Sequence, residues 1–245
     1  MKQGWYEIRE NCGVAPRVYR LRLAGDTSGM VRGGQFVDIA LDGFFLRRPF
    51  GVASWDAGEM TLYYKVVGEG TRMMARLRPG VRLDVLTGLG NGFDAACCLR
   101  EALLVGGGLG ASPMLPLARE LAGQGKRVVA VLGFNRAADI VLAEEYRALG
   151  ADVCVVTLDG SAGWRGTVCD ALRKRQPAYD YFYTCGPKVM MQAVCDMLDG
   201  PGEASLEERM GCGCGICCGC TCRTAKGAKA VCSDGPVFKK EDIVW

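Results

Sequence analysis

The chain contains no histidine. This absence excludes a Ser-His-Asp triad, a Rieske iron–sulfur centre and any zinc or haem site that needs an imidazole ligand. Whatever chemistry the protein performs must therefore come mainly from bound cofactors, which favours electron transfer over hydrolysis.

Long apolar runs and strong charge are also lacking. No run of about eighteen apolar residues occurs, so we expect no membrane span. The formal net charge is only +3, and Lys and Arg are scattered along the chain, which gives no case for a nucleic-acid partner. The N-terminal residues 1–5 form no apolar signal segment. With 14 cysteines and no such signal, a reducing, cytoplasmic location is expected.

Length and composition indicate a globular protein with several parts. At 245 residues, the chain can form two modest domains and an appendage. Its 49% hydrophobic content and 35 glycines favour a folded, turn-rich protein over a disordered one. The hydrophobic pattern changes twice along the chain, which divides it into residues 1–98, 99–201 and 202–245.

The most specific pattern lies between Cys212 and Cys232, a segment that holds seven of the 14 cysteines. Its spacing, Cys212-x4-Cys217-x2-Cys220 followed by the more distant Cys232, is that of a plant-type [2Fe–2S] cluster. Thiolates are soft ligands that suit iron and bridging sulfide. The glycines between them let a tight loop turn its amides toward the sulfurs. The segment therefore predicts an iron–sulfur cluster.

Other interpretations of this segment stay open. Four thiolates can also bind zinc, although structural zinc sites usually pair two short C-x2-C knuckles. A disulfide knot would need an oxidising compartment, and a disordered tail would need no ordered spacing. Spacing alone also does not exclude one of the three extra thiols, Cys214, Cys218 and Cys222, as a ligand.

Residues 1–98 show the alternation of short antiparallel strands. Apolar side chains alternate with polar ones over residues 19–23, 37–42, 62–66 and 81–85, and Asp38 is expected on the face away from the barrel interior. Turn signals separate these runs: Gly33-Gly34, Asp56-Ala57-Gly58 and Pro79-Gly80. Strands at this spacing predict a closed or nearly closed antiparallel Greek-key barrel.

Two stretches of this barrel have the chemistry of a phosphate site. Residues 46–51 place an arginine at a rigid, extended strand end, where its guanidinium could pair with a pyrophosphate. Residues 67–71 form a glycine turn before a helix predicted over residues 72–77, whose first amides could bind a phosphate oxygen. Each stretch alone is more often an ordinary strand end or capped turn. Just upstream, the run Tyr63-Tyr64-Lys65 could line a flavin ring, although strand aromatics more often only pack.

Residues 99–201 switch to alternating strands and helices. A short buried strand at residues 102–105 is followed by Gly106-Gly107-Gly108-Leu109-Gly110-Ala111-Ser112-Pro113. A helix is predicted from there to about Ala122, with Ser112 as its N-cap and Pro113 as its first residue. Such glycines let a dinucleotide approach the backbone, while the helix N-terminus faces its phosphates. Only the looser G-x-G-x-x-A form is satisfied, so a purely structural turn is an equal alternative.

The alternation continues, with strands predicted at residues 128–134, 153–157 and 179–184 and helices at residues 140–149, 167–175 and 189–198. This order predicts a doubly wound parallel sheet with ligands at the carboxyl ends of its strands. Three stretches fall at those ends: residues 106–110, residues 133–136 and Cys185-Gly186-Pro187. We expect them to form one dinucleotide site, although Cys185 alone is more often a small buried residue.

Together these residues resemble the ferredoxin-NADP reductase superfamily, and most closely the electron-transfer subunits of NAD-linked dihydroorotate dehydrogenases. The resemblance covers essentially the whole chain. One departure is Gly51, which stands where the family motif usually has Ser, and others are the extra thiols Cys214 and Cys218 in the cluster loop. The motifs that carry the resemblance are Arg48-Pro49-Phe50-Gly51, residues 67–71, Gly90-Asn91-Gly92-Phe93, residues 106–113, Asp159-Gly160-Ser161, Cys185-Gly186-Pro187, residues 208–213 and residues 232–238.

The resemblance implies FAD in the barrel, NAD on the sheet and a [2Fe–2S] cluster in the C-terminal module. The flavin-binding residues that it implies are Arg48, Pro49, Phe50, Gly51, Tyr63, Tyr64, Lys65, Gly70 and Thr71. Those for NAD are Gly107, Gly108, Gly110, Cys185, Gly186 and Pro187. The implied cluster ligands are Cys212, Cys217, Cys220 and Cys232.

The resemblance also implies a function and a partner. NADH carries two electrons as a hydride, whereas a [2Fe–2S] cluster takes one electron at a time. A flavin can do either, so the three cofactors form an electron-transfer chain. The expected partner is an FMN-containing catalytic subunit that oxidises dihydroorotate in pyrimidine biosynthesis, in a heterotetramer with two copies of each chain. Alternatives are a subunit of a hydrogenase, sulfide dehydrogenase or bifurcating transhydrogenase, or a zinc-bound NAD-sensing protein.

Overall fold

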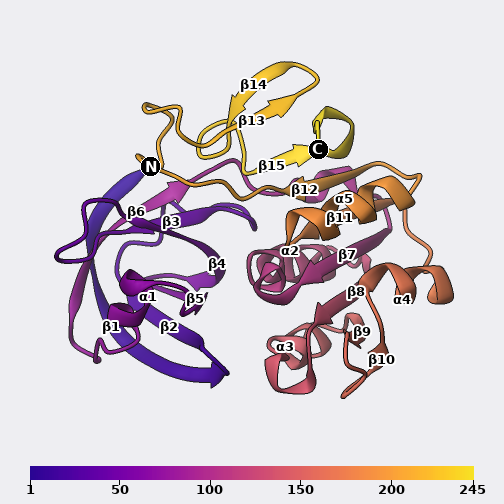
Figure 1. Cartoon of the computed structure of the whole chain (residues 1–245), viewed down its shortest axis with the longest axis horizontal. Helices are drawn as coiled ribbons and strands as arrows, with labels where there is room; N and C mark the ends of the chain where they lie inside the picture. Colours follow the sequence, from indigo (N-terminus) through magenta and orange to yellow (C-terminus); the bar gives the residue numbers. More distant parts are fainter.

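The computed structural model describes all 245 residues and places a β-barrel beside a helix-covered sheet, with the cysteine-rich segment lying across both (Figure 1). The barrel has the strand order β1-β2-β5-β4-β3-β6, and β6 closes it by pairing antiparallel with β1. This confirms the predicted antiparallel barrel. Its strands are β1 (Lys2–Ala15), β2 (Val18–Ala24), β3 (Phe36–Ile39), β4 (Arg48–Asp56), β5 (Glu59–Lys65) and β6 (Arg82–Leu89).

Alternation fills the barrel interior with apolar side chains, among them Leu21, Ile39 and Leu62, which are almost completely buried. Asp38 faces away from this interior, yet it is only 2% exposed. The cysteine-rich segment covers it, because a Cβ placed on Gly213 would lie 2.6 Å from Asp38 Oδ2. Burial raises the pKa of Asp38 to about 6. Alternation thus predicts the side of the strand, but not what covers that side.

The short helix α1 (Glu69–Met74) begins three residues before the predicted start at residue 72. Gly68 is its N-cap, and the Thr71 hydroxyl accepts hydrogen bonds from the backbone N–H groups of Val67 (2.9 Å) and Gly68 (3.1 Å). The glycine turn is therefore the first turn of the helix, because hydrogen bonds to the Thr71 hydroxyl cap the helix start.

The second half of the chain forms a seven-stranded sheet in the order β10-β9-β8-β7-β11-β12-β15. All neighbouring pairs from β10 to β12 are parallel, as predicted, and β15 pairs antiparallel with β12. The strands are β7 (Glu101–Gly107), β8 (Arg127–Phe134), β9 (Asp152–Thr157), β10 (Trp164–Arg165), β11 (Tyr181–Cys185), β12 (Gly202–Ser205) and β15 (Val237–Lys239).

Helices cover both faces of this sheet, as a doubly wound fold requires (Figure 1). On one face, α2 (Ala111–Gly123) and α3 (Ala143–Ala148) pack in a core that includes Leu104 and Ala130. On the other, α4 (Val168–Arg175) and α5 (Lys188–Met197) pack against Leu103 and Val129. None of the helices is long and apolar enough to cross a bilayer.

Two helix starts differ from the prediction. The N-cap of α2 is Gly110, so Ser112 is the second helical residue and not the cap, because the 3₁₀ turn η2 (Gly108–Gly110) runs directly into the helix. α3 is shorter than the predicted residues 140–149. A 3₁₀ turn, η3 (Ala137–Asp139), precedes it, and Leu142 adopts a left-handed conformation with φ of 66° that starts the helix only at Ala143.

Residues 202–245 also contain a hairpin, formed by β13 (Thr221–Thr224) and β14 (Gly227–Ala230), and the 3₁₀ turn η4 (Lys240–Asp242). The remaining 3₁₀ turn, η1 (Ala95–Cys97), joins the barrel to β7. Because β12 and β15 both belong to the sheet, residues 202–245 are not a separate layer. The division of the chain at residue 201 stays a prediction.

Asn91, which follows β6 of the barrel, forms hydrogen bonds that fix residues 235–237. Its backbone N–H donates to Gly235 O at 2.8 Å, and its side-chain Nδ2 donates to Val237 O at 2.8 Å. Its Oδ1 accepts a hydrogen bond from Val237 N at 3.1 Å. One side chain from the barrel thus fixes the strand that follows the last cysteine.

Glu203 is a buried carboxyl where β12 meets the end of the barrel. It is 6% exposed, and its Oε2 accepts a hydrogen bond from Asp94 N at 3.0 Å. Burial raises its pKa from 4.5 to about 7. The folded state therefore binds this proton more tightly than the unfolded state, so the contribution of Glu203 to stability falls as the pH rises from 4.5 to about 7.

We expect Glu203→Gln to raise the free energy of unfolding at pH 8 by about 1–2 kcal/mol and to change it little at pH 4.5. Glutamine removes the buried charge and can still accept the hydrogen bond from Asp94 N. Urea unfolding at the two pH values measures the effect, with Glu120→Gln on α2 as the control. An equal change at both pH values would contradict the assignment.

Candidate functional site: a flavin cavity, a nucleotide cavity and a cysteine cluster

The two arginines of the strand-end motif have different roles. Arg47 Nη2 lies 2.6 Å from Asp84 Oδ2, and Arg47 Nη1 donates to Asp84 O at 3.0 Å, so this side chain joins the β3–β4 loop to β6. Arg48 makes no salt bridge. Its guanidinium lies against the glycine turn, because a Cβ on Gly70 would come within 2.8 Å of Arg48 Nε. Arg48 Nη1 donates to the backbone carbonyl groups of Leu46 and Arg47, so its Nε and Nη2 edge, beside the glycine turn, is the part that is available to bind an anion.

The structure brings the two predicted phosphate stretches together at this point. The first helical hydrogen bond of α1 is donated by Arg72 to Gly68 O at 2.9 Å, so the amides of Gly70 and Thr71 lie ahead of the helical ladder. The Thr71 hydroxyl, in contrast, is bound within its own turn. A guanidinium beside free amides is a suitable pyrophosphate site, in which Thr71 contributes its backbone and not its hydroxyl.

A cavity of about 250 Å³ lies between β4, β5 and the start of α2. Phe50 and Tyr64 stand at its wall with ring centroids 5.8 Å apart. Tyr64 also stacks on Tyr19 and donates to Asn11 Oδ1 at 2.9 Å, so packing accounts for part of its role. The other sequence-predicted flavin residues that line this flavin cavity are Pro49, Gly51, Tyr63 and Lys65.

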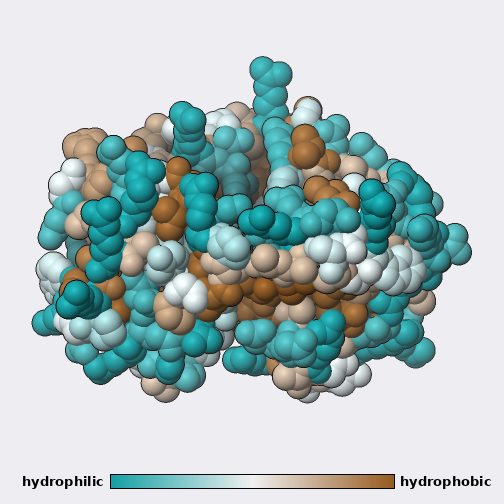
Figure 2. Space-filling model, turned by 60° about the horizontal axis from the view of Figure 1, so that its bottom comes forward, coloured by the Kyte–Doolittle hydropathy of each residue, from teal (hydrophilic) through white to brown (hydrophobic).

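A second cavity, of about 820 Å³, opens at the carboxyl ends of β7, β8 and β11, and its volume suits a dinucleotide. Its walls include parts of all three stretches that the sequence places at strand ends: residues 107–110 of 106–110, residues 133–135 of 133–136, and Gly186-Pro187. Cys185, which was predicted as an NAD-binding residue, lines the flavin cavity and not this one. Figure 2 shows hydrophobic residues gathered in a band across the middle of one face, with hydrophilic residues around them. This nucleotide cavity forms the predicted crevice of a doubly wound sheet.

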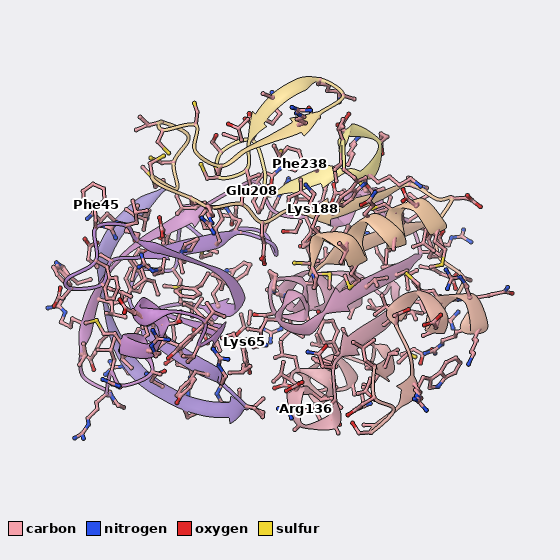
Figure 3. All side chains as sticks on the ribbon, viewed as in Figure 1. Phe45, Lys65, Arg136, Lys188, Glu208 and Phe238 are labelled. Atoms are coloured by element: carbon pink, nitrogen blue, oxygen red, sulfur yellow. The ribbon has the colours of Figure 1, made fainter.

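The flavin cavity and the nucleotide cavity adjoin. Lys65, Leu109 and Glu207 line both of them. In Figure 3, Lys65 lies in the gap between the barrel and the sheet half of the molecule. Groups bound in the two cavities can therefore meet directly, which hydride transfer requires. Leu109 and Glu207 were not predicted as site residues, although each lies beside a motif that was.

The glycines of the predicted nucleotide loop divide into two kinds. A Cβ on Gly110 would overlap the Cys185 carbonyl group, and one on Gly107 would lie 2.5 Å from Met190 Sδ, so both allow close packing. Gly108 has a φ of 55° with open space beside it. Gly108 thus borders open space in the nucleotide cavity, whereas Gly110 lets the start of α2 approach the end of β11 and Gly107 lets α5 approach β7.

Cys185, at the end of β11, is 1% exposed and lines the flavin cavity. Burial raises the pKa of its thiol to about 12, so the thiol is neutral at physiological pH. A neutral, buried thiol is not a nucleophile or a metal ligand. Cys185 therefore acts as a small wall residue between the flavin cavity and the adjacent Gly186 and Pro187.

The sulfur of each of the four predicted cluster ligands accepts at least one backbone N–H. Cys217 N donates to Cys212 Sγ, Gly219 N to Cys217 Sγ and Cys232 N to Cys220 Sγ, all at 3.4 Å, and Gly215 N donates to Cys232 Sγ at 3.1 Å. Amides from Cys214 and Cys217 lower the pKa of Cys212 to about 6. Such N–H···S bonds stabilise thiolate charge, which an iron–sulfur cluster requires.

Several thiols of the segment interact. Those of Cys212 and Cys217 interact with each other, as do those of Cys220 and Cys232, and Cys214 also interacts with Cys212. A binuclear cluster takes two thiolates per iron, whereas a zinc site takes four thiolates on one ion. The feature that favours the cluster over zinc is the C-x4-C-x2-C spacing followed by the distant Cys232.

The three extra thiols have different surroundings. Burial is the main cause that raises the pKa of Cys214 and of Cys222, which lies on β13. Cys218 is exposed, with a φ of 55°. Burial raises the pKa of Cys232 as well, so the sequence spacing, and not the pKa, selects the four predicted ligands.

The cysteine segment reaches the flavin cavity. Met210, two residues before Cys212, and Pro236, four residues after Cys232, both line that cavity. Glu208, from the same segment, lies above the junction of the barrel and the sheet in Figure 3. A cluster held by these cysteines is therefore close to a ring in the flavin cavity.

We expect Arg48→Gln to weaken FAD binding about 10- to 100-fold, because a charge-assisted contact to a phosphate is lost. Fluorescence titration of flavin-free protein with FAD measures the affinity. Arg82→Gln, on the exposed end of β6, removes the same charge and should leave the affinity unchanged. Equal weakening in both variants would mean that net charge, and not the pyrophosphate contact, sets FAD affinity.

Comparison with known proteins agrees with this geometry. Residues 207–244 match the iron–sulfur cluster binding domain of dihydroorotate dehydrogenase B, and residues 104–196 match the oxidoreductase NAD-binding domain. The "Dihydroorotate dehydrogenase B (NAD(+)), electron transfer subunit" of Bacillus velezensis is 39% identical over 99% of this chain and 99% of its own length. The protein of the same name from Bacillus caldolyticus is 42% identical over 94% of each chain.

Among solved structures, the NADH-dependent reduced ferredoxin-NADP oxidoreductase, described in a study of flavin-based electron bifurcation, has a TM-score of 0.90 and 30% identity over 98% of this chain and 90% of that one. A Malassezia yamatoensis flavohemoglobin with bound FAD and heme has a TM-score of 0.68 at 18% identity, over 80% of this chain and 56% of its own length, and so shares the fold. With matches to the iron–sulfur and NAD-binding domains and relatives 39–42% identical over nearly its whole length, this chain belongs to the family of dihydroorotate dehydrogenase B electron-transfer subunits.

Proposed function

We propose that this chain carries electrons from a dihydroorotate-oxidising catalytic subunit to NAD+, by way of its [2Fe–2S] cluster and FAD, in pyrimidine biosynthesis. The full-length relatives, at 37–42% identity, bear the name of that electron-transfer subunit. The observation that carries the proposal is the order of the three sites: the cysteine segment lines the flavin cavity, and the flavin cavity adjoins the nucleotide cavity.

FAD, when bound, exchanges two electrons with a nicotinamide and single electrons with an iron–sulfur cluster. The chain contributes placement. Arg48 and the amides of Gly70 and Thr71 bind the pyrophosphate, and Phe50 holds the ring of the flavin. Gly108 admits the nicotinamide nucleotide, and Pro187 lines its cavity. We assign these three tasks to residues 1–98, 99–201 and 202–245, with the cluster held by the last of them.

The ligands of the cluster are proposed to be Cys212, Cys217, Cys220 and Cys232. The support is the C-x4-C-x2-C spacing followed by the distant Cys232, together with the backbone N–H that each of these sulfurs accepts. A zinc-bound regulatory protein would need all four sulfurs around one ion.

We further propose that the catalytic partner contains FMN and that the complex holds two copies of each chain in the cytoplasm. All 14 cysteines are free of disulfides, which suits a reducing compartment. A second candidate function, a subunit of an electron-bifurcating transhydrogenase, is favoured by the TM-score of 0.90 to the ferredoxin-NADP oxidoreductase. Its 30% identity is lower than the 37–42% of the dihydroorotate dehydrogenase relatives.

The deciding experiment combines the purified chain with its candidate catalytic subunit under anaerobic conditions. Dihydroorotate should then reduce NAD+, and neither chain alone should catalyse this reaction. Native mass measurement gives the stoichiometry, and flavin extraction shows whether the partner holds FMN. If reduced ferredoxin or NADPH reduces the flavin while dihydroorotate does not, the transhydrogenase function is correct and the proposed one is wrong.

A further inference from the structure

Ser112, the second residue of α2, has a buried hydroxyl without a partner. The side chain is 2% exposed, and its Oγ is one of two buried side-chain polar atoms in the chain that make no hydrogen bond, the other being Asp38 Oδ1. Ser112 lines the flavin cavity. Burying a hydroxyl without a hydrogen bond destabilises the fold, so a partner is expected to come from outside the chain.

The other hydroxyls of the flavin cavity differ from that of Ser112. Tyr64 donates to Asn11 Oδ1 at 2.9 Å. Tyr63 lies near Arg20, and Ser205 lies near the thiol of Cys185. Ser112 is the hydroxyl of this cavity whose oxygen is buried without a partner.

On the β4 side of the cavity, Pro49, Phe50 and Gly51 provide no side-chain hydrogen-bond donor. Gly51 faces the start of α2, and a Cβ placed on it would lie 3.0 Å from Pro113 Cβ. A side chain at this position of β4 would thus press against the proline that follows Ser112.

We propose that the Ser112 hydroxyl forms a hydrogen bond with the polar edge of the flavin ring and so positions the ring between Phe50 and the nucleotide cavity. A flavin ring carries hydrogen-bonding nitrogen and oxygen atoms along one edge, whereas its other end is apolar. Ser112 orients this edge, because the rest of the wall near Gly51 is apolar. The inference rests on the proposed function only in that the chain holds FAD in this cavity.

The test compares Ser112→Ala with the wild-type chain, each with and without FAD and with the cluster retained. Without FAD, alanine removes an unpaired hydroxyl, so the midpoint of thermal unfolding should stay the same or rise. With FAD, the stabilisation by the ligand should shrink, and the Kd for FAD should increase about three- to tenfold. The visible absorption bands of the bound flavin should also shift, because a hydrogen bond to the ring changes its electronic environment.

Ser28→Ala is the matched control, since this exposed serine bonds only to Asp26 and Lys2 at the far end of the barrel. It should leave the Kd and the flavin spectrum unchanged. If Ser112→Ala lowers the melting temperature equally with and without FAD, its role is internal to the fold and the inference is wrong. An unchanged Kd and spectrum would also overturn it. Dihydroorotate-driven NAD+ reduction by the wild-type complex tests the proposed function separately.

Discussion

Cys220→Ser is expected to lower dihydroorotate-driven NAD+ reduction by the reconstituted complex by more than about 100-fold, because loss of a metal ligand costs at least as much as loss of a second-shell partner. Oxygen is a harder ligand than sulfur and holds an iron–sulfur cluster poorly. Cys220 is 1% exposed, and its sulfur accepts a hydrogen bond from Cys232 N. The serine hydroxyl that replaces the thiol also loses the N–H···S hydrogen bond from Cys232.

The variant should retain FAD and should still oxidise NADH with an artificial two-electron acceptor, because neither cavity contains Cys220. Iron analysis and the visible spectrum of anaerobically purified protein measure the loss of the cluster directly. Loss of dihydroorotate-driven NAD+ reduction with NADH oxidation retained would show that the cluster is missing and that the chain is still folded.

Cys222→Ser is the matched control. Cys222 lies two residues further on, on β13, outside the C-x4-C-x2-C spacing that selects the predicted ligands. We expect this variant to keep its iron and its full rate. If Cys222→Ser lost the cluster and Cys220→Ser kept it, the ligand assignment would be wrong by one thiol. A colourless protein that contains zinc in both variants would instead exclude the redox function.

Gly110→Ala should have the second large effect, a loss of more than about 3 kcal/mol in the free energy of unfolding. The added Cβ would overlap the backbone carbonyl of Cys185, and neither the end of β11 nor the start of α2 can retreat without disturbing the sheet core. Because these two segments form the wall between the cavities, NAD+ and FAD affinity should fall as well. Denaturant unfolding and nucleotide titration measure both losses.

Gly108→Ala provides the contrast within the same loop. No atom lies within 4 Å of a Cβ at Gly108, so the only internal cost is the left-handed φ of 55°, about 1 kcal/mol. Stability should change little, while NAD+ binding weakens because the methyl group enters the nucleotide cavity. If Gly108→Ala proved the more destabilising of the two, the division of the loop into packing and ligand-facing glycines would be wrong.

The sequence predicts the barrel, the parallel sheet and the cofactors because each has a local signature. Alternation marks Leu21 and Leu23 as interior residues, and the cysteine spacing alone points to a plant-type cluster. The same spacing cannot show which backbone N–H groups point at the sulfurs. Those contacts depend on the path of the loop around Gly215 and Gly219, which no pattern of residue types specifies.

Other features depend on contacts between distant segments. Arg47 and Arg48 are equivalent in sequence. Arg47 has a structural role only because Asp84 on β6 lies close enough to form a salt bridge with it. Ser112 has the composition of an N-cap, but the 3₁₀ turn ahead of it moves the cap to Gly110. Asp38 alternates outward as expected, and its burial becomes visible only when the cysteine segment folds over it. Local propensity was overridden by tertiary packing in each case.

The position of β15 affects how the protein is made. The barrel can close as soon as β6, which ends at Leu89, has left the ribosome, whereas the sheet receives its edge strand only when residues 237–239 emerge. Until then β12 has one unpaired side, a template on which another nascent chain could add a strand. Cys232 precedes β15 by only a few residues, so the strand that covers the edge of the sheet also fixes the position of the last proposed cluster ligand. A chain that fails to place β15 would therefore leave both the edge of β12 and the cysteine site incomplete.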